Sequence, residues 1–181
     1  MVVQDNGGDF ERISLGTHRA ICINVFDLGL QPGYEGGPPT RKCYLLFEAE
    51  EREENSGKRF QVGKIYTQSI GDKSNLGNDL ASWRTRPFTA EEKKGFEVAN
   101  IIGKPCQLNM VAPAKGDRPK IGTILPADKS RPYWTPETSK DFVPKFIQKM
   151  IDEQIHEAIK PKGTQTQPAM AADGFTDDIP F

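Results

Sequence analysis

The chain has 181 residues, a net charge of −1 and a hydrophobic fraction of 36%. This length holds one domain of ordinary size, and the modest apolar content predicts a small core with solvated segments beside it. There is no run of 18 apolar residues, and the first residues lack the basic and apolar regions of a signal peptide, so we expect a cytoplasmic protein without a membrane span. Cys22, Cys43 and Cys106 are scattered in apolar contexts, which predicts buried free thiols and argues against a disulfide framework or a zinc site.

Charge is distributed unevenly along the chain. Residues 1–54 carry −5, residues 55–135 carry +7, residues 136–162 are neutral and residues 163–181 carry −3. A basic middle followed by an acidic end indicates a polyanionic partner, although an excess of charge is also typical of a solvated face.

Three strands are predicted in the first 70 residues. Residues 16–28 are mixed and β-branched, and a loop rich in Gly and Pro follows them. Residues 41–50 alternate, with Cys43, Leu45, Phe47 and Ala49 on one face. The acidic run that begins at Glu48 is interpreted as a solvated hairpin turn.

A third strand spans residues 58–70. Its apolar positions change parity around Gly63, which predicts a β-bulge. If so, Val62 and Ile65 point inward, and Lys64 and Tyr66 point outward together.

A helix is predicted next, followed by two more strands. Leu76, Leu80 and Trp83 share one helical face behind the cap Ser74, and Thr89 begins a capping-box pattern. Residues 104–113 and 120–127 have strand character. Three strands, a helix and two strands is the order of the OB-fold, a five-stranded Greek-key barrel with its helix between strands three and four, and it also fits other small α+β sheets.

The composition changes after Ala127. A polar connector leads to an amphipathic helix at 141–159, whose isoleucine stripe fits packing on the barrel or pairing with a second copy in a homodimer. The following residues have little to bury, which predicts disorder. We therefore expect an OB-fold domain at 1–127, a connector and amphipathic helix at 128–160, and a disordered acidic tail at 161–181.

The sequence offers little support for catalysis. It has two histidines, His18 and His156, and neither a nucleophile motif nor a phosphate-binding loop. We expect no enzymatic activity, no catalytic residue, no metal site and no cofactor.

Binding of single-stranded nucleic acid needs basic groups that follow the phosphates and aromatic faces on which bases stack. In OB-folds, strands two and three and the loops after strands one and four supply them. Phe60 and Trp83 are assigned to the core. The predicted nucleic-acid-binding residues are Tyr34, Arg41, Tyr44, Lys58, Arg59, Lys64, Tyr66, Lys73, Arg84, Arg86, Lys115, Arg118 and Lys120.

The chain ends in GFTDDIPF. Asp177, Asp178, Ile179, Pro180 and Phe181 resemble, position by position, the tip of bacterial single-stranded DNA-binding proteins. Phe175 matches an aromatic residue common just upstream, and Thr176 departs from the family, which usually has an acid there. The resemblance implies docking to replication, recombination and repair proteins, with a phenylalanine in an apolar pocket and the acids on its basic rim.

The body of the chain resembles a different group, phage-encoded single-stranded DNA-binding and replication-associated proteins. The similarity spans about residues 16–125 and rests on five stretches: Asp27–Gly29, Tyr66–Ile70, Lys73–Leu76, Asp79–Thr89 and Gly103–Cys106. It implies an OB-fold and DNA binding in the cytoplasm of a bacterial host.

The sequence thus predicts a protein that coats single-stranded DNA in phage replication and recombination and recruits host or phage proteins through its tip. The alternative is an adaptor or decoy that captures host repair enzymes through the tip without binding DNA. Strand annealing would use the same binding surface as coating.

Overall fold

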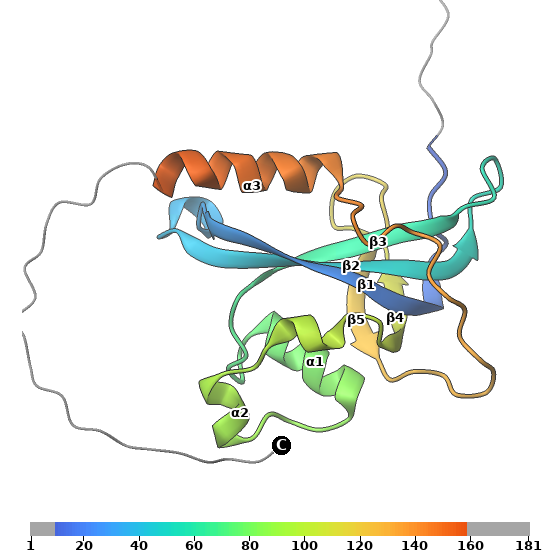
Figure 1. The fold of residues 1–181 in the computed structure, drawn as a ribbon, viewed down its shortest axis with the longest axis horizontal. Coiled ribbons are helices and arrows are strands. Elements are labelled where there is room, and N and C mark those ends of the chain that lie inside the picture. The colour runs from blue at the N-terminus through green and yellow to red at the C-terminus, as the bar shows by residue number, and fades with distance from the viewer. Residues whose placement is uncertain (1–9, 159–181) are drawn as a thin grey trace, which may run out of the picture.

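The computed structural model describes residues 10–158, with side chains through residue 154. The predicted order of three strands, a helix and two strands is confirmed (Figure 1). The predicted tail and its tip lie outside the described residues. The elements are β1 (Gly16–Gln31), β2 (Thr40–Arg52), β3 (Arg59–Thr67), α1 (Asn75–Arg84), α2 (Ala90–Lys94), β4 (Pro105–Val111), β5 (Lys120–Leu125) and α3 (Lys145–Ala158), with short 3-10 turns at Tyr34–Gly36 and Val98–Ile101.

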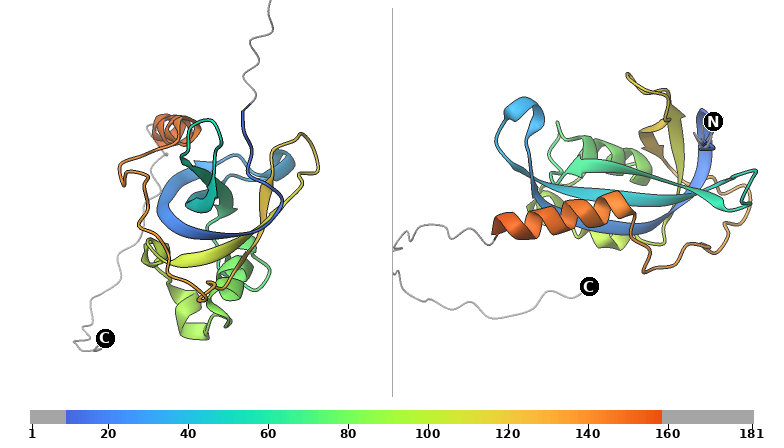
Figure 2. Two further views of the ribbon diagram at one scale, coloured as in Figure 1. Left: turned by 90° about the vertical axis from the view of Figure 1, so that its right-hand side faces the viewer. Right: turned by 90° about the horizontal axis from the view of Figure 1, so that it is seen from above.

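The strands form one antiparallel sheet in the order β3-β2-β1-β4-β5. The sheet is strongly curled, and its two edge strands, β3 and β5, approach each other (Figure 2). Lys64 Nζ on β3 reaches the backbone oxygen of Gly122 on β5 at 3.3 Å. Helices α1 and α2 lie on one side of the sheet, and α3 lies on the other (Figure 1).

The bulge predicted at Gly63 is wrong. Gly63 pairs regularly with Leu46. The register shifts lie elsewhere, between Glu48 and Arg52 in the β2–β3 pairing and at two places in β1, one of them beside Gly29 with its positive φ of 62°. The physical reason for a glycine at 63 is crowding, because a Cβ there would lie 2.3 Å from the Tyr44 hydroxyl oxygen. The ring of Tyr44 therefore lies across a position that no larger residue can occupy.

The main core lies on the inner face of the curled sheet. The predicted alternation of Cys43, Leu45, Phe47 and Ala49 is confirmed, since all four are buried there. Phe60 is buried in the same core and Trp83 packs against it, as expected. Ser74 caps α1 and Thr89 forms a complete capping box with Glu92, which confirms both predicted helix starts.

A second, smaller core lies between the outer face of the sheet and α3. Leu28, Tyr44 and Leu46 from the sheet contact Ile147 of α3, which is fully buried. The predicted amphipathic helix thus packs on the sheet, the first of the two arrangements that its apolar stripe allows.

The connector between β5 and α3 is fastened by Glu48, a carboxylate with no exposure to solvent. Its oxygens accept hydrogen bonds from Trp134 Nε1 at 2.8 Å, from the backbone nitrogens of Glu137 and Thr138, and from Thr138 Oγ1 at 2.7 Å. The prediction that Glu48 lies in a solvated turn is therefore wrong. A strand side chain on the outer face instead supplies the acceptor for a distant loop.

No helix within residues 10–158 is long and apolar enough to cross a membrane.

We predict that Glu48→Gln lowers the free energy of unfolding at neutral pH by about 3 kcal/mol, because an amide NH₂ would face donors in a buried site. Burial acts to raise the pKa of Glu48, but the hydrogen bonds from Thr138, Glu137 and Trp134 outweigh it and hold the pKa below its usual range. The stabilisation is therefore complete above the ordinary glutamate pKa and is lost as the pH falls through the folded-state value. Urea unfolding followed by circular dichroism between neutral and acidic pH measures both effects.

The control for this prediction is Glu91→Gln, which removes an exposed partner of Lys94 on α2. It should change the free energy of unfolding by less than about 0.5 kcal/mol. Equal losses in the two variants would contradict the anchoring role of Glu48.

Candidate nucleic-acid interface

A groove of about 670 Å³ lies beside the β3 edge of the sheet. Four segments that are distant in the sequence enclose it. They are the residues before β1, the hairpin between β2 and β3, the loop between β4 and β5, and the first turn of α3. Its lining includes four aromatic residues, Phe10, Tyr44, Phe60 and Phe146, and four basic residues, Arg12, Lys58, Arg59 and Arg118.

Two aromatic side chains on the groove are open to solvent. Phe10 is 74% exposed and Phe146 is 51% exposed, so both rings are accessible from solvent. Phe146 is held in place by an edge-to-face contact with Tyr44, with ring centroids 5.4 Å apart. Phe146 thus offers a fixed ring to solvent at one end of the groove.

Basic side chains flank these rings. Lys58 on the β2–β3 hairpin and Arg118 on the β4–β5 loop are exposed, and neither forms an ion pair with another described residue. Lys115 on the same loop is exposed, and so is Lys120, the first residue of β5. Arg12 also lines the groove but pairs with Asp117. The groove therefore combines free cations with exposed rings.

Arg59 and Tyr44 line this groove but are committed to packing. The Arg59 guanidinium lies 4.2 Å from the ring centre of Trp134 and donates to the backbone oxygen of Glu50. Tyr44 faces away from the main core, as predicted, but α3 covers it and leaves it only 6% exposed. Burial raises its pKa to about 12. The expectation of an exposed tyrosine platform at this position is wrong, because the second core needs the ring.

Lys64 and Tyr66 share one face, but the predicted direction is wrong. Both point to the inner side of the sheet, because β3 runs without the bulge that would have turned them outward. Tyr66 is 2% exposed and donates from its hydroxyl to Asp79 Oδ2 at 2.7 Å, and Lys64 Nζ donates to the same oxygen at 2.8 Å. Burial, together with the Asp79 charge, raises the pKa of Tyr66 far above its usual range.

Asp79 thereby joins three elements. It projects from α1, accepts from Lys64 and Tyr66 on β3, and accepts from Thr123 Oγ1 on β5 at 3.2 Å. Because β3 and β5 are the two edges of the sheet, this carboxylate holds the edges near each other and fixes the position of the β4–β5 loop.

The remaining predicted residues lie away from the groove. Tyr34, Arg41 and Lys73 are exposed near the opposite end of β2, where Arg41 pairs with Asp27. Arg84 and Arg86 at the end of α1 both pair with Glu92, whose pKa falls to about 2, first through the backbone hydrogen bond from Thr89 and then through the two arginines. The thirteen predicted residues therefore do not form one surface.

Sequence reasoning missed three residues on the groove: Phe10, Arg12 and Phe146. Phe10 stands between Asp9 and Glu11, and so polar a stretch indicates an exposed segment. The sequence pattern places Phe146 in the apolar stripe of the helix, and only the packing direction of α3 shows that it lies on the edge of that stripe.

Ser14, His18 and Glu51 lie together, and nucleophilic catalysis uses these residue types. Here the serine hydroxyl donates to Glu51 Oε2 at 2.7 Å, while His18 Nε2 is 2.8 Å from the backbone oxygen of Ser14 and 3.4 Å from its hydroxyl. The histidine is therefore not placed to take the hydroxyl proton. The cluster fastens the residues before β1 to β2.

A comparison with models of protein families finds none that matches this chain, and a comparison with curated proteins also finds no match.

We predict that Tyr66→Phe lowers the free energy of unfolding by about 1–2 kcal/mol, because the substitution removes a buried hydrogen bond to the Asp79 carboxylate. Tyr34→Phe is the matched control, because Tyr34 is 85% exposed, and it should change stability by less than about 0.5 kcal/mol. Thermal unfolding of the two variants measures the difference. Similar melting temperatures would contradict the structural role of the Tyr66 hydroxyl.

Proposed function

We propose that this protein binds single-stranded DNA without sequence preference in the groove beside β3. The observation that carries the proposal is the combination, in one groove, of two solvent-exposed rings, Phe10 and Phe146, with the free cations Lys58 and Arg118.

This combination favours a single strand over a duplex. Bases stack on a protein ring only when they are not stacked in a helix, and stacking accepts every base because each has a flat π-face. The cations attract phosphates regardless of sequence. Neither kind of contact reads base edges, so we expect similar affinity for different sequences.

The topology supports placing the groove in an OB-type barrel. Five antiparallel strands in the order β3-β2-β1-β4-β5, with the helix α1 between β3 and β4, are compatible with a five-stranded, partly open OB-type barrel. The groove lies between β3 and the β4–β5 loop, which belong to the usual ligand-binding side of that fold. The loop between β1 and β2 does not line it, so the proposed site is shifted toward the β2–β3 hairpin.

The proposal also includes a biological role in DNA replication and recombination. The resemblance of residues 16–125 to phage-encoded DNA-binding proteins favours a non-enzymatic coating role in replication and recombination in the cytoplasm of a bacterial host. The resemblance of Asp177 to Phe181 to the bacterial tip favours recruitment of replication and repair proteins.

We predict that the double variant Lys58→Glu/Arg118→Glu binds labelled oligo-dT at least about tenfold more weakly at low salt. The slope of log affinity against log salt should become less steep by about 0.7 for each phosphate that the variant no longer neutralises. The control is Lys94→Glu on α2, an exposed lysine paired with Glu91 outside the groove. It should leave both values unchanged.

Fluorescence anisotropy at several salt concentrations provides this test. Equal affinity for duplex and single strand would contradict the proposal. Two results together would favour the adaptor function over DNA binding. The wild-type protein would not bind oligo-dT at low salt, and it would retain host repair proteins in a pull-down only when Asp177 to Phe181 are present.

We further predict that Phe10→Ala and Phe146→Ala each weaken oligo-dT binding by roughly 5-fold to 100-fold, the range expected for one stacked base. Phe142→Ala is the matched control, because Phe142 is 38% exposed and does not line the groove. Its affinity should stay within about twofold of wild type if stacking accounts for the effect. Weaker binding with an unchanged salt slope would identify base stacking as the interaction that the two substitutions remove.

A further inference from the structure

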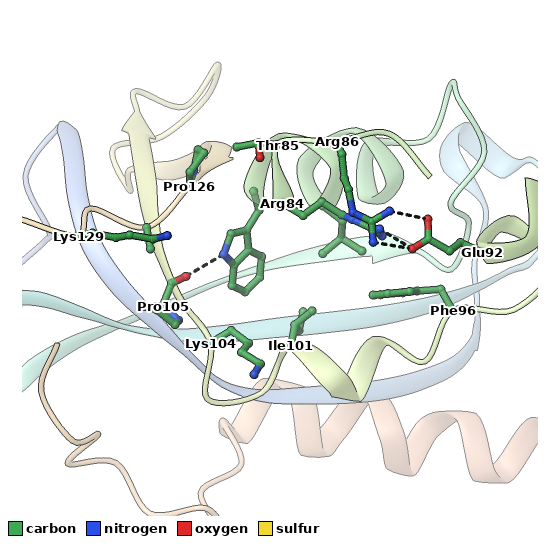
Figure 3. Close-up of a pocket in the computed structure, with 13 residues that line it drawn as sticks. Arg84, Thr85, Arg86, Glu92, Phe96, Ile101, Lys104, Pro105, Pro126 and Lys129 are labelled. Carbon is green, nitrogen blue, oxygen red and sulfur yellow. Dashed lines mark hydrogen bonds and ion pairs between the residues drawn. The ribbon is translucent and has the colours of Figure 1, made fainter. Parts of the chain in front are cut away.

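A second pocket, of about 500 Å³, lies on the side of the sheet that carries α1 and α2 (Figure 3). It shares no residue with the groove beside β3. Leu80, Trp83, Phe96 and Ile101 supply apolar lining. The indole of Trp83 is held in the lining by a hydrogen bond from Nε1 to the backbone oxygen of Pro105 at 2.8 Å.

The charges around this pocket are mostly positive. Arg84, Arg86, Lys104 and Lys129 line it together with one carboxylate, that of Glu92. Figure 3 shows Lys129 on one side of the pocket and the two arginines with Glu92 on the other. The arginines share Glu92, while Lys104 and Lys129 are exposed and form no ion pair within the described part of the chain.

An apolar pocket with a basic rim fits a short acidic peptide that carries large apolar side chains. A stretch of this chain has that composition: residues 175–181 contain two phenylalanines, an isoleucine and a proline with two adjacent aspartates. The apolar side chains match the lining around Trp83, and Asp177 and Asp178 match the two free lysines.

The stretch can also reach the pocket. Sixteen residues, 159–174, separate α3 from Phe175, which allows a span of up to about 50 Å. A compact body of about 150 residues has a radius of gyration of about 15 Å, so the extended connection is about three times as long as that radius.

We propose that residues 175–181 dock, within the same molecule, in the pocket around Trp83, with the aspartates beside Lys104 and Lys129. The inference rests on the part of the proposed function in which the tip binds partner proteins, and not on DNA binding. A docked tip is hidden from partner proteins, so a partner must displace it. The apparent affinity for the partner is then reduced by the fraction of molecules with a free tip.

The test compares the full chain with a variant that ends at Gly174, by NMR of the Trp83 indole N–H in the absence of DNA. We expect the resonance to move on truncation and to return when a synthetic peptide of residues 174–181 is added. In the truncated protein, Lys104→Glu/Lys129→Glu should weaken binding of that peptide at least about tenfold at low salt. Lys115→Glu/Lys120→Glu, which changes two exposed lysines outside the pocket, should leave it unchanged.

Three outcomes would overturn the proposal. The first is an identical Trp83 resonance in the full and truncated chains. The second is peptide binding that is abolished in Lys58→Glu/Arg118→Glu but kept in Lys104→Glu/Lys129→Glu, which would place the tip in the groove. The third is a Trp83 shift that depends on protein concentration, which would mean that the tip comes from a second copy. Because no DNA is present, failure of this test leaves the DNA-binding proposal intact, and failure of DNA binding leaves this one intact.

Discussion

A carboxylate that is removed from solvent must find its hydrogen bonds inside the protein, and Glu48 finds them on residues 134–138. That requirement fixes where the connector crosses β2, and the connector fixes where α3 begins. Once α3 lies on the outer face, Tyr44 is enclosed and Phe146 is placed at the rim of the groove. The proposed binding surface therefore depends on a contact that no ligand touches, since moving the connector would move one wall of the groove.

Features that depend on near neighbours in the chain could be predicted from the sequence. The caps at Ser74 and Thr89 need residues within one helical turn, and the burial of Cys43, Leu45 and Phe47 follows from strict alternation. The number and order of the strands follow in the same way, because each is delimited by its own turn residues. The exposure of Arg118 was also accessible, since it belongs to a short polar turn between strands. Lys58 was assigned to the third strand but lies just before β3.

The features that could not be predicted depend on residues far apart in the sequence. The burial of Tyr66 is explained by Asp79, which lies on a different element and supplies the partner for its hydroxyl. The parity of β3 is misleading because Gly63 resembles a bulge, whereas it makes room for the ring of Tyr44 from the paired strand. The connector places α3 on the outer face of the sheet and so decides which surface remains open. Nothing in β2 or β3 alone indicates that a helix will cover Tyr44.

The basic middle of the chain separates into groups with different physical roles. Arg59 and Lys64 are held by neighbouring carboxylates or rings and stabilise the fold. Lys58 and Arg118 beside the groove, and Lys104 and Lys129 beside Trp83, form no ion pair with another residue between positions 10 and 158. A polyanion and an acidic peptide would therefore be attracted to two different places on one small domain.

Because the two proposed sites share no residue, they could be occupied together. Any coupling between bound DNA and a docked tip would then pass through long-range charge repulsion or through the shared core. The first of these weakens with salt, since exposed charges farther apart than a Debye length of about 10 Å at 0.1 M are largely screened. Coupling that persists at high salt would therefore point to the core, in which α1 and β3 are joined by Asp79.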